Sequence, residues 1–167
     1  MTHTVHQPST ALPASGHASR LVEVAIATPI EAELVASIRA VSERVSLLYQ
    51  PELLPPTRYP EDHRGVAGFR RDAKAEGRWQ GLLARAEVLF GIPDDSPQGL
   101  AAVMRGSPRL RWVQGTAAGT GEQLKAAGLS KDELERVTVT SASGVHVGPL
   151  AEFCLLGLLA FTKGLPR

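Results

Sequence analysis

The chain alternates short apolar runs with stretches in which apolar side chains recur every three or four residues. The run at residues 21–27 is rich in aliphatic side chains and stops at Thr28-Pro29, which predicts a strand that opens into a loop. In the next stretch, residues 31–42, the apolar positions share one helical face: Leu34, Val35, Ile38 and Val41. A strand followed by a helix is a βα unit and favours an α/β protein.

The same two patterns continue along the chain. Strands are expected at residues 21–27, 45–49, 88–92, 110–114 and 137–141. Helices are expected at residues 31–42, 78–87, 96–105, 121–128 and 131–136, and again in a last apolar stretch after residue 148. Between Gln50 and about Gly77 the sequence is rich in proline and lacks periodicity. Irregular segments of this length in compact domains are typically functional lids or mobile segments.

Strands that alternate with helices, and that lack strict polar alternation, indicate a parallel sheet covered on both faces. We therefore expect an α/β fold of the flavodoxin-like kind, with a doubly wound parallel five-stranded sheet. Ligands in such sheets bind beyond the carboxyl ends of the strands. The expected layout is a disordered leader at residues 1–20, a flavodoxin-like domain at 21–148 and a final helix at 149–167.

The final helix is apolar on almost every side. Its large apolar side chains cannot all point one way at 3.6 residues per turn, as is clear for Leu155, Leu156, Leu158, Leu159 and Phe161. We expect one face of this helix to pack on the fourth and fifth strands and the other face to stay bare. The isolated chain should therefore form a homodimer through the helix or behave as a loosely packed, dye-binding species.

The composition of the chain excludes some classes of binding partner. The 18 Lys and Arg residues nearly balance the 17 Asp and Glu residues, so nucleic acid and anionic membranes are not expected as partners. The last apolar run is about half of the roughly 20 residues that a membrane span needs. The single cysteine, Cys154, excludes an internal disulfide, is expected to be a small buried side chain, and makes the cytoplasm the default location.

The sequence does not match the common catalytic and cofactor-binding motifs. Gly119-Thr-Gly121 begins like a dinucleotide fingerprint, but Leu124 stands where the third small residue belongs, and the first strand has no glycine loop. There is no Walker loop, and Ser141 replaces the first glycine that a hydrolase elbow around Ser143 would need. The His and carboxylate residues lack metal-ligand spacing. We therefore expect no catalytic residues and no metal site in this chain.

One loop remains as a candidate site, at residues 115–121 after the fourth strand. Its small side chains allow a ligand to approach the backbone, and successive N–H groups at a turn can hold a carboxylate. A tight turn that needs glycine for its dihedral angles would have the same composition. Four polar or aromatic residues around the proline-rich segment form a second candidate, either as pocket lining or as a solvated loop: Tyr49, Arg58, Tyr59 and His63.

Two segments together resemble a known family. Residues 110–119, Leu-Arg-Trp-Val-Gln-Gly-Thr-Ala-Ala-Gly, and residues 137–153, with Ala151-Glu152 opening an apolar helix, are similar to the D-isomer-specific 2-hydroxyacid dehydrogenases, in the glyoxylate and hydroxypyruvate reductase-like branch. The resemblance runs from about Val22 to Arg167. It implies that the amides of Ala118 and Gly119 bind the substrate carboxylate and that Val147 approaches the nicotinamide of NAD or NADP.

The resemblance also has departures. Many members have Asp where this chain has Gly121. In the family the dinucleotide glycines, the catalytic arginine and the glutamate and histidine acid–base pair follow the helix that crosses to the Rossmann domain, whereas this sequence stops at Arg167. The expectation is a truncated substrate domain of an NAD(P)-dependent oxidoreductase acting on 2-oxoacids or 2-hydroxyacids, inactive alone and binding neither NAD nor NADP.

Two alternatives are open. One is half of a split dehydrogenase, whose cofactor domain is a separate polypeptide. The other is a stand-alone flavodoxin-like binding or regulatory module. Such a module would be a well-packed monomer and would need a polar exposed face on its last helix, where few polar positions occur between Leu150 and Phe161.

Overall fold

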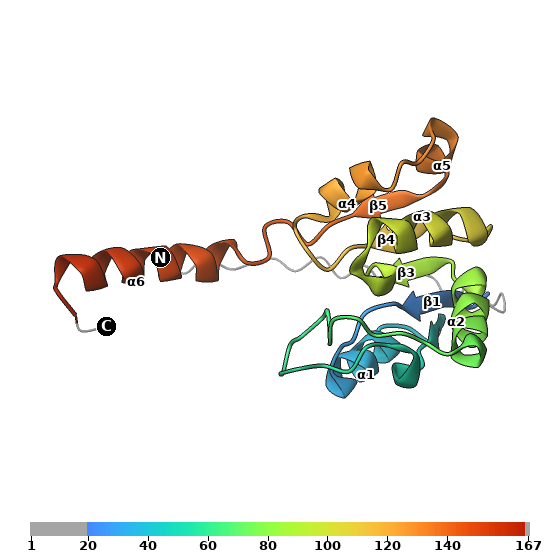
Figure 1. Ribbon diagram of the computed structural model, residues 1–167, viewed down its shortest axis with the longest axis horizontal. Coiled ribbons are helices and arrows are strands. Elements are labelled where there is room, and N and C mark those ends of the chain that lie inside the picture. The colour runs from blue at the N-terminus through green and yellow to red at the C-terminus, as the bar shows by residue number, and fades with distance from the viewer. Residues whose placement is uncertain (1–19, 166–167) are drawn as a thin grey trace, which may run out of the picture.

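The computed structural model describes residues 20–165, and all but the last residue of the leader expected at 1–20 lies outside them. The chain forms an α/β domain around one sheet whose five strands are all parallel, in the order β2-β1-β3-β4-β5 (Figure 1). This order is consistent with the flavodoxin-like fold. The strands are β1 Val22–Ile26, β2 Val45–Leu48, β3 Val88–Phe90, β4 Trp112–Gln114 and β5 Thr138–Thr140. All five lie inside the expected segments, so the α/β class and the parallel sheet are confirmed.

Six α-helices and two 3-10 turns connect the strands or follow them. The helices are α1 Ala32–Ala40, α2 Ala73–Arg85, α3 Pro97–Gly106, α4 Thr120–Ala126, α5 Lys131–Arg136 and α6 Val147–Thr162. The 3-10 turns are η1 Pro51–Leu53 and η2 Pro93–Asp95. The main correction concerns α2, which begins five residues before the expected Arg78. Asp72 caps it by accepting a hydrogen bond from the Ala75 amide at 2.7 Å, in a first turn with no apolar periodicity to reveal it.

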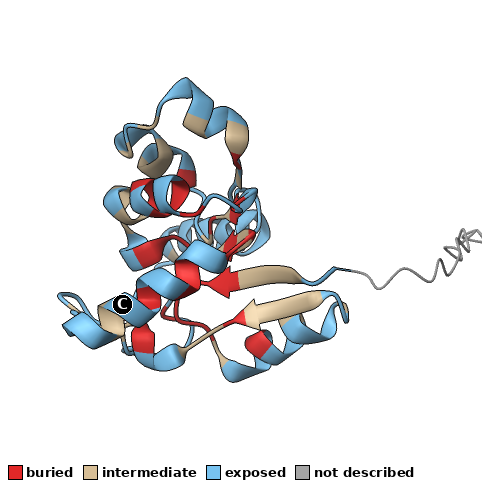
Figure 2. Cartoon of the chain, turned by 90° about the vertical axis from the view of Figure 1, so that its right-hand side faces the viewer, coloured by how far each residue is buried: buried red, intermediate tan, exposed pale blue. Residues whose placement is uncertain are grey.

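The larger core lies between the sheet and the helices that connect β2 to β5. Right-handed crossovers place α2, α3, α4 and α5 on one face of this sheet. Ala25, Leu89 and Val113 point to that face and pack with Trp79, Leu100 and other side chains of α2 and α3. Figure 2 shows the buried residues concentrated in the strands and in the helices beside them. This packing fixes the carboxyl ends of the strands as one rigid edge.

The opposite face of the sheet is only partly covered. Among the described helices, α1 packs there, and its Val35 joins Ile26 in a small second core. Farther along the same face, a group of half-buried or exposed side chains belongs to neither core, and we call this group the open patch: Val24, Val88, Trp112, Gln114, Thr138 and Thr140. Trp112 is 43% exposed. Parallel sheets normally have both faces covered, so the open patch is an unusual feature.

The last helix, α6, extends away from the sheet as a separate arm (Figure 1). None of its residues is buried, so the expectation that one of its faces packs on β4 and β5 is wrong. Cys154 is exposed rather than buried for the same reason. The helix begins at Val147, two residues before the expected boundary. Within residues 20–165, no helix has the combined length and apolar character that crossing a bilayer requires.

Candidate functional site

The loop from β4 to α4 lies at the carboxyl edge of the sheet and is closed by Thr120. The Thr120 hydroxyl donates to the carbonyl of Ala117 at 2.7 Å, and the residue is 2% exposed. A Cβ added at Gly115 would lie 2.0 Å from that hydroxyl oxygen. Gly115 is therefore required by the close approach of Thr120, and neither it nor Gly119 has a positive φ. The alternative that a tight turn needs these glycines for their dihedral angles is therefore wrong.

Ala118 and Gly119, the residues expected to bind a carboxylate, are both exposed. Gly119 is the N-cap of α4, with φ −77° and ψ 9°. Neither the Ala118 amide nor the Gly119 amide donates to an acceptor within residues 20–165. Two neighbouring N–H groups are thus available to solvent or to a ligand at the edge of the sheet. Gly121, where many members of the resembled family carry Asp, is the second residue of α4, and a Cβ there would meet nothing within 4 Å.

Val147 lies on the segment that leaves this edge. It is the first residue of α6 and is 63% exposed. The preceding turn contacts the glycine loop, because the Ser143 hydroxyl donates to the Ala118 carbonyl at 3.4 Å. The structure therefore joins the loop of Ala118 to the start of α6 through Ser143. Within residues 20–165, no backbone hydrogen bond joins Val147 to Ala118 or Gly119.

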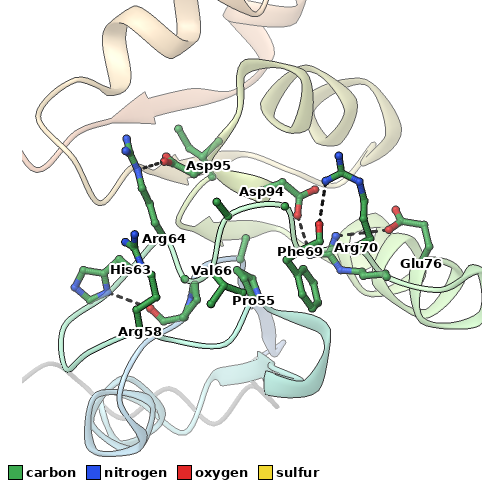
Figure 3. A pocket seen from close by; sticks show the side chains of 17 residues that line it. Pro55, Arg58, His63, Arg64, Val66, Phe69, Arg70, Glu76, Asp94 and Asp95 are labelled. Atoms are coloured by element: carbon green, nitrogen blue, oxygen red, sulfur yellow. Dashed lines mark hydrogen bonds and ion pairs between the residues drawn. The ribbon is translucent and has the colours of Figure 1, made fainter.

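A pocket of about 690 Å³ opens where β1 and β3 end, beneath the irregular segment between η1 and α2 (Figure 3). Its apolar lining includes Ala27, Ile92 and Phe69. Its polar lining is dense in charge and comes from the irregular segment, α2 and η2: Arg58, His63, Arg64, Arg70, Arg71, Glu76, Asp94 and Asp95. The pocket gathers the end of β1 and two loops, as expected for a ligand site in a parallel α/β sheet.

Arg71 ties the irregular segment to its surroundings. Its side chain is 5% exposed, and it donates to the carbonyl of Leu53 at 2.6 Å and to Asp94 at 2.8 Å. Its guanidinium also lies 4.4 Å from the ring centroid of Trp79 and 3.6 Å from Glu76. These contacts satisfy a nearly buried cation, so Arg71 holds the pocket wall in place and is not a free ligand for an anion.

Asp62 and Arg58 form a second fixed point of the same segment. Asp62 is 3% exposed and accepts from Arg58 Nε at 2.7 Å and Nη2 at 2.8 Å. The Arg58 guanidinium, assisted by backbone amides, holds the pKa of the Asp62 carboxyl well below its usual range. The backbone amide of Arg58 also donates to this carboxylate at 2.9 Å. The pair therefore stabilises the turn at residues 58–62 of the irregular segment. Because the Asp62 carboxyl stays ionised, it offers no proton for general acid catalysis.

The η2 turn brings two carboxylates to the pocket and links it to the glycine loop. Asp94 and Asp95 have positive φ values of 55° and 44°. Asp95 pairs with Arg64, and its Oδ1 accepts from the side-chain amide of Gln123 at 2.9 Å. Gln123 lies on α4, the helix capped by Gly119. The pocket and the exposed amides are thus adjacent parts of one edge, joined by Asp95 and Gln123.

The charges in the pocket nearly compensate. Arg58, Arg64 and Arg71 are each paired with a carboxylate, whereas Arg70 bonds only to the carbonyl of Phe69 among the described residues. Such a site suits a small polar molecule better than a highly charged one. Within residues 20–165, no three His, Cys, Asp or Glu side chains are gathered closely enough to hold a metal ion.

Only some of the residues at this edge of the sheet were predicted from the sequence. Arg58 and His63 do line the pocket, and Tyr59 lines a smaller hollow of about 470 Å³ beside Glu31. Tyr49 is outside both, and its partial burial raises the pKa of its hydroxyl. Sequence reasoning missed Arg64, Arg71, Glu76, Asp94 and Asp95. The adjacent pairs Arg70-Arg71 and Asp94-Asp95, at the ends of two expected loops, were the available signal.

Comparison of the chain with protein-family models, with curated proteins and with solved structures found no match in any of the three.

Proposed function

We propose that this chain is the substrate domain of an NAD(P)-dependent D-2-hydroxyacid dehydrogenase, which interconverts 2-oxoacids and 2-hydroxyacids. One observation carries the proposal. The loop that bears the sequence resemblance presents two exposed amides, those of Ala118 and Gly119, at the carboxyl edge of a parallel sheet, and neither has an acceptor within the described part of the chain. Paired backbone N–H groups at such an edge are suited to bind a carboxylate.

The substrate class follows from what the amides can recognise. A 2-oxoacid carries its carboxylate next to the reacting carbonyl, so anchoring the carboxylate also positions the carbonyl. The loop is held rigidly, since Thr120 closes it from within and the Thr140 carbonyl accepts from the Gly115 amide at 2.8 Å. Ala117, Ala118 and Gly119 have small side chains or none, which leaves room for a two- or three-carbon acid to reach the backbone.

The proposal assigns hydride and proton transfer to a second domain. Reduction of a 2-oxoacid needs a nicotinamide held against the substrate and a proton donor for the carbonyl oxygen. The edge described here offers neither a glycine fingerprint after β1 nor an unpaired acid in the pocket. In this proposal α6 is the helix that connects the two domains, and Val147 faces the nicotinamide from the substrate side. The second domain belongs either to the same polypeptide or to a separate chain.

The exposure of α6 favours this proposal over a stand-alone regulatory module. A monomeric module needs a polar outer face on its last helix. Instead, large apolar side chains are exposed on all sides of α6, with Phe153 at 72% and Phe161 at 85%. Such a helix requires a covering partner, which a second domain or subunit supplies.

The test is a titration of the isotopically labelled protein with glyoxylate and with oxalate, followed by nuclear magnetic resonance. The amide signals of Ala118 and Gly119 should shift with saturation. Gly119→Val should weaken binding on the order of tenfold, because a branched side chain then occupies the approach to the amides. A Cβ added at Gly119 would meet nothing within 4 Å, and the φ of −77° is one that residues with a side chain adopt.

Gly121→Ala is the matched control, since it adds a side chain two residues farther along the chain in equally open space. It should bind both acids as the unmodified protein does. Equal shifts in Gly119→Val and in the unmodified protein, with both folded, would remove this loop from the site.

A further inference from the structure

The proposed function places a carboxylate at the amides of Ala118 and Gly119 and assigns no ligand to the pocket beneath the irregular segment. We propose that this pocket is a second ligand site, which binds a small zwitterion, namely an α-amino acid with an apolar side chain. Its carboxylate binds Arg70, and its ammonium group binds between Asp94 and Glu76. The inference goes beyond the dehydrogenase proposal and does not depend on it, because neither Ala118 nor Gly119 lines the pocket.

The wall that the irregular segment contributes is held in place before any ligand binds. Gly65, with φ 71°, lies so close to Pro55 that an added Cβ would be 2.7 Å from the Pro55 Cβ. The Val66 amide donates to the Pro56 carbonyl at 2.9 Å, which joins the two arms of the segment. The cavity is therefore preformed, as small-molecule sites usually are.

The backbone around the pocket is strained. Within residues 20–165, three residues other than glycine have a positive φ, and all three belong to the irregular segment or to η2: Glu61, Asp94 and Asp95. Asp94 and Asp95 line the pocket directly. Left-handed backbone at residues with a side chain costs free energy and is concentrated at ligand sites. The η2 turn thus keeps two carboxylates at the pocket at a conformational cost.

The charges at one side of the pocket separate into a negative and a positive pole. Arg71 is shared by two carboxylates, Asp94 at 2.8 Å and Glu76 at 3.6 Å, so this group has one negative charge in excess. Arg70 bonds only to the Phe69 carbonyl among the described residues and has no carboxylate partner there. In Figure 3 Asp94, Arg70 and Glu76 lie together at this side of the pocket.

The remaining arginines of the lining add no net charge. Arg58 is paired with Asp62, and Arg64 with Asp95. A ligand with a single charge of either sign would satisfy one pole and leave the other unmatched. An α-amino acid carries a carboxylate and an ammonium group on the same carbon atom, so it complements both poles and brings no net charge into the pocket.

The rest of the lining decides what side chain the amino acid carries. Ala27, Val66, Phe69 and Ile92 present apolar surface to the pocket, whose volume of about 690 Å³ accommodates a large side chain. Sites of this kind gain affinity from apolar surface and orientation from a few polar groups. We therefore expect a large apolar or aromatic side chain, and L-phenylalanine is the probe.

The test titrates nitrogen-15 protein with L-phenylalanine and with two analogues that each lack one charge. Phenethylamine lacks the carboxylate, and hydrocinnamate lacks the ammonium group. L-phenylalanine should bind saturably and shift amide signals of residues 64–71 and 92–95. Each analogue should bind about tenfold more weakly, because it leaves one pole unmatched. This comparison needs no substitution. Equal affinities for the three molecules, no saturable binding, or shifts confined to Ala118 and Gly119 would overturn the proposal.

Two variants assign the poles. Arg70→Gln should raise the dissociation constant of L-phenylalanine on the order of tenfold and leave that of phenethylamine unchanged, since only the amino acid has a carboxylate to lose its partner. Glu76→Gln should weaken L-phenylalanine and leave hydrocinnamate unchanged. Arg39→Gln is the matched control, at an exposed arginine of α1 outside the pocket lining. It should bind all three molecules as the unmodified protein does. A loss in Arg70→Gln that is equal for L-phenylalanine and phenethylamine overturns the assignment.

Discussion

At the scale of single residues, the irregular segment is held by two arginines that do different things. Arg58 neutralises Asp62 inside the segment, whereas Arg71 fastens the segment to η1, η2 and α2. In both contacts a carboxylate neutralises an arginine that lines the pocket. A substrate in this pocket would therefore meet hydrogen-bonding groups whose charges are already balanced, with Arg70 as the exception.

Asp62 should make the stability of the domain depend on pH. Its pKa is lowered in the folded state, so its stabilising effect is fully present above the unfolded pKa of about 3.9 and is lost as pH falls through the folded value. Asp62→Asn should therefore lower the urea midpoint at pH 7, and the difference from the unmodified protein should shrink below about pH 4.

The control for this prediction is Glu43→Gln, at an exposed carboxylate with no ion pair among the described residues. It should leave the urea midpoint unchanged at both pH values. A loss of stability in Asp62→Asn that is equally large at pH 7 and at pH 3 would mean that the amide disturbs packing and that the ion pair is unimportant.

At the scale of elements, the contact between β4 and α4 decides where the candidate amides lie. Thr120, the first residue of α4, packs directly over Gly115, the residue after β4. Beyond this contact residues 117–119 are exposed, so the Ala118 and Gly119 amides lie at the surface of the domain. The glycine at position 115 is thus a structural requirement of the site, although it does not bind the ligand itself.

Gly115→Ala should destabilise the domain by about 1–3 kcal/mol, because the new Cβ overlaps a buried side chain that cannot move away. Gly121→Ala, in the open first turn of α4, should instead be stabilising by about 0.5–1 kcal/mol. Denaturant unfolding of both variants gives the comparison. Similar stabilities in the two variants would contradict the close packing of Thr120 on Gly115.

At the scale of the whole molecule, the two faces of the sheet differ in how they are covered. Trp79, Leu100 and Met104 are each no more than 1% exposed on the face of α2 and α3, while Trp112 on the opposite face is 43% exposed. The apolar arm α6 is fully outside both cores. Residues 20–165 therefore form a well-packed centre with two apolar surfaces that are not buried within this part of the chain.

The whole chain should bind neither NADH nor NADPH with useful affinity. The Gly119-Thr-Gly121 sequence is followed by Leu124, which packs against the main core where the dinucleotide fingerprint needs a small residue. The loop after β1, Thr28-Pro29, has no glycine to admit a pyrophosphate. Calorimetric titration should show no saturable heat, and a dissociation constant in the low micromolar range for either dinucleotide would contradict the prediction.

The sequence by itself determined the order and kind of the elements. Apolar runs ended by proline or glycine are local signals, and they placed all five strands and the parallel α/β class. The start of α2 was not predicted correctly, because its first turn is polar and depends on the Asp72 cap. The glycine loop at the carboxyl edge was also predictable, since its position follows from the strand before it.

Only the tertiary structure decided the pocket and the free surfaces. Arg71 reaches Leu53 and Asp94 across 18 and 23 residues of sequence, and no periodicity in an irregular segment encodes such contacts. The sequence showed that α6 must be covered, but a helix that is apolar on every side does not say by what. The direction of the crossovers put four helices on one face of the sheet and α1 on the other, an arrangement that depends on strand order and not on any one helix.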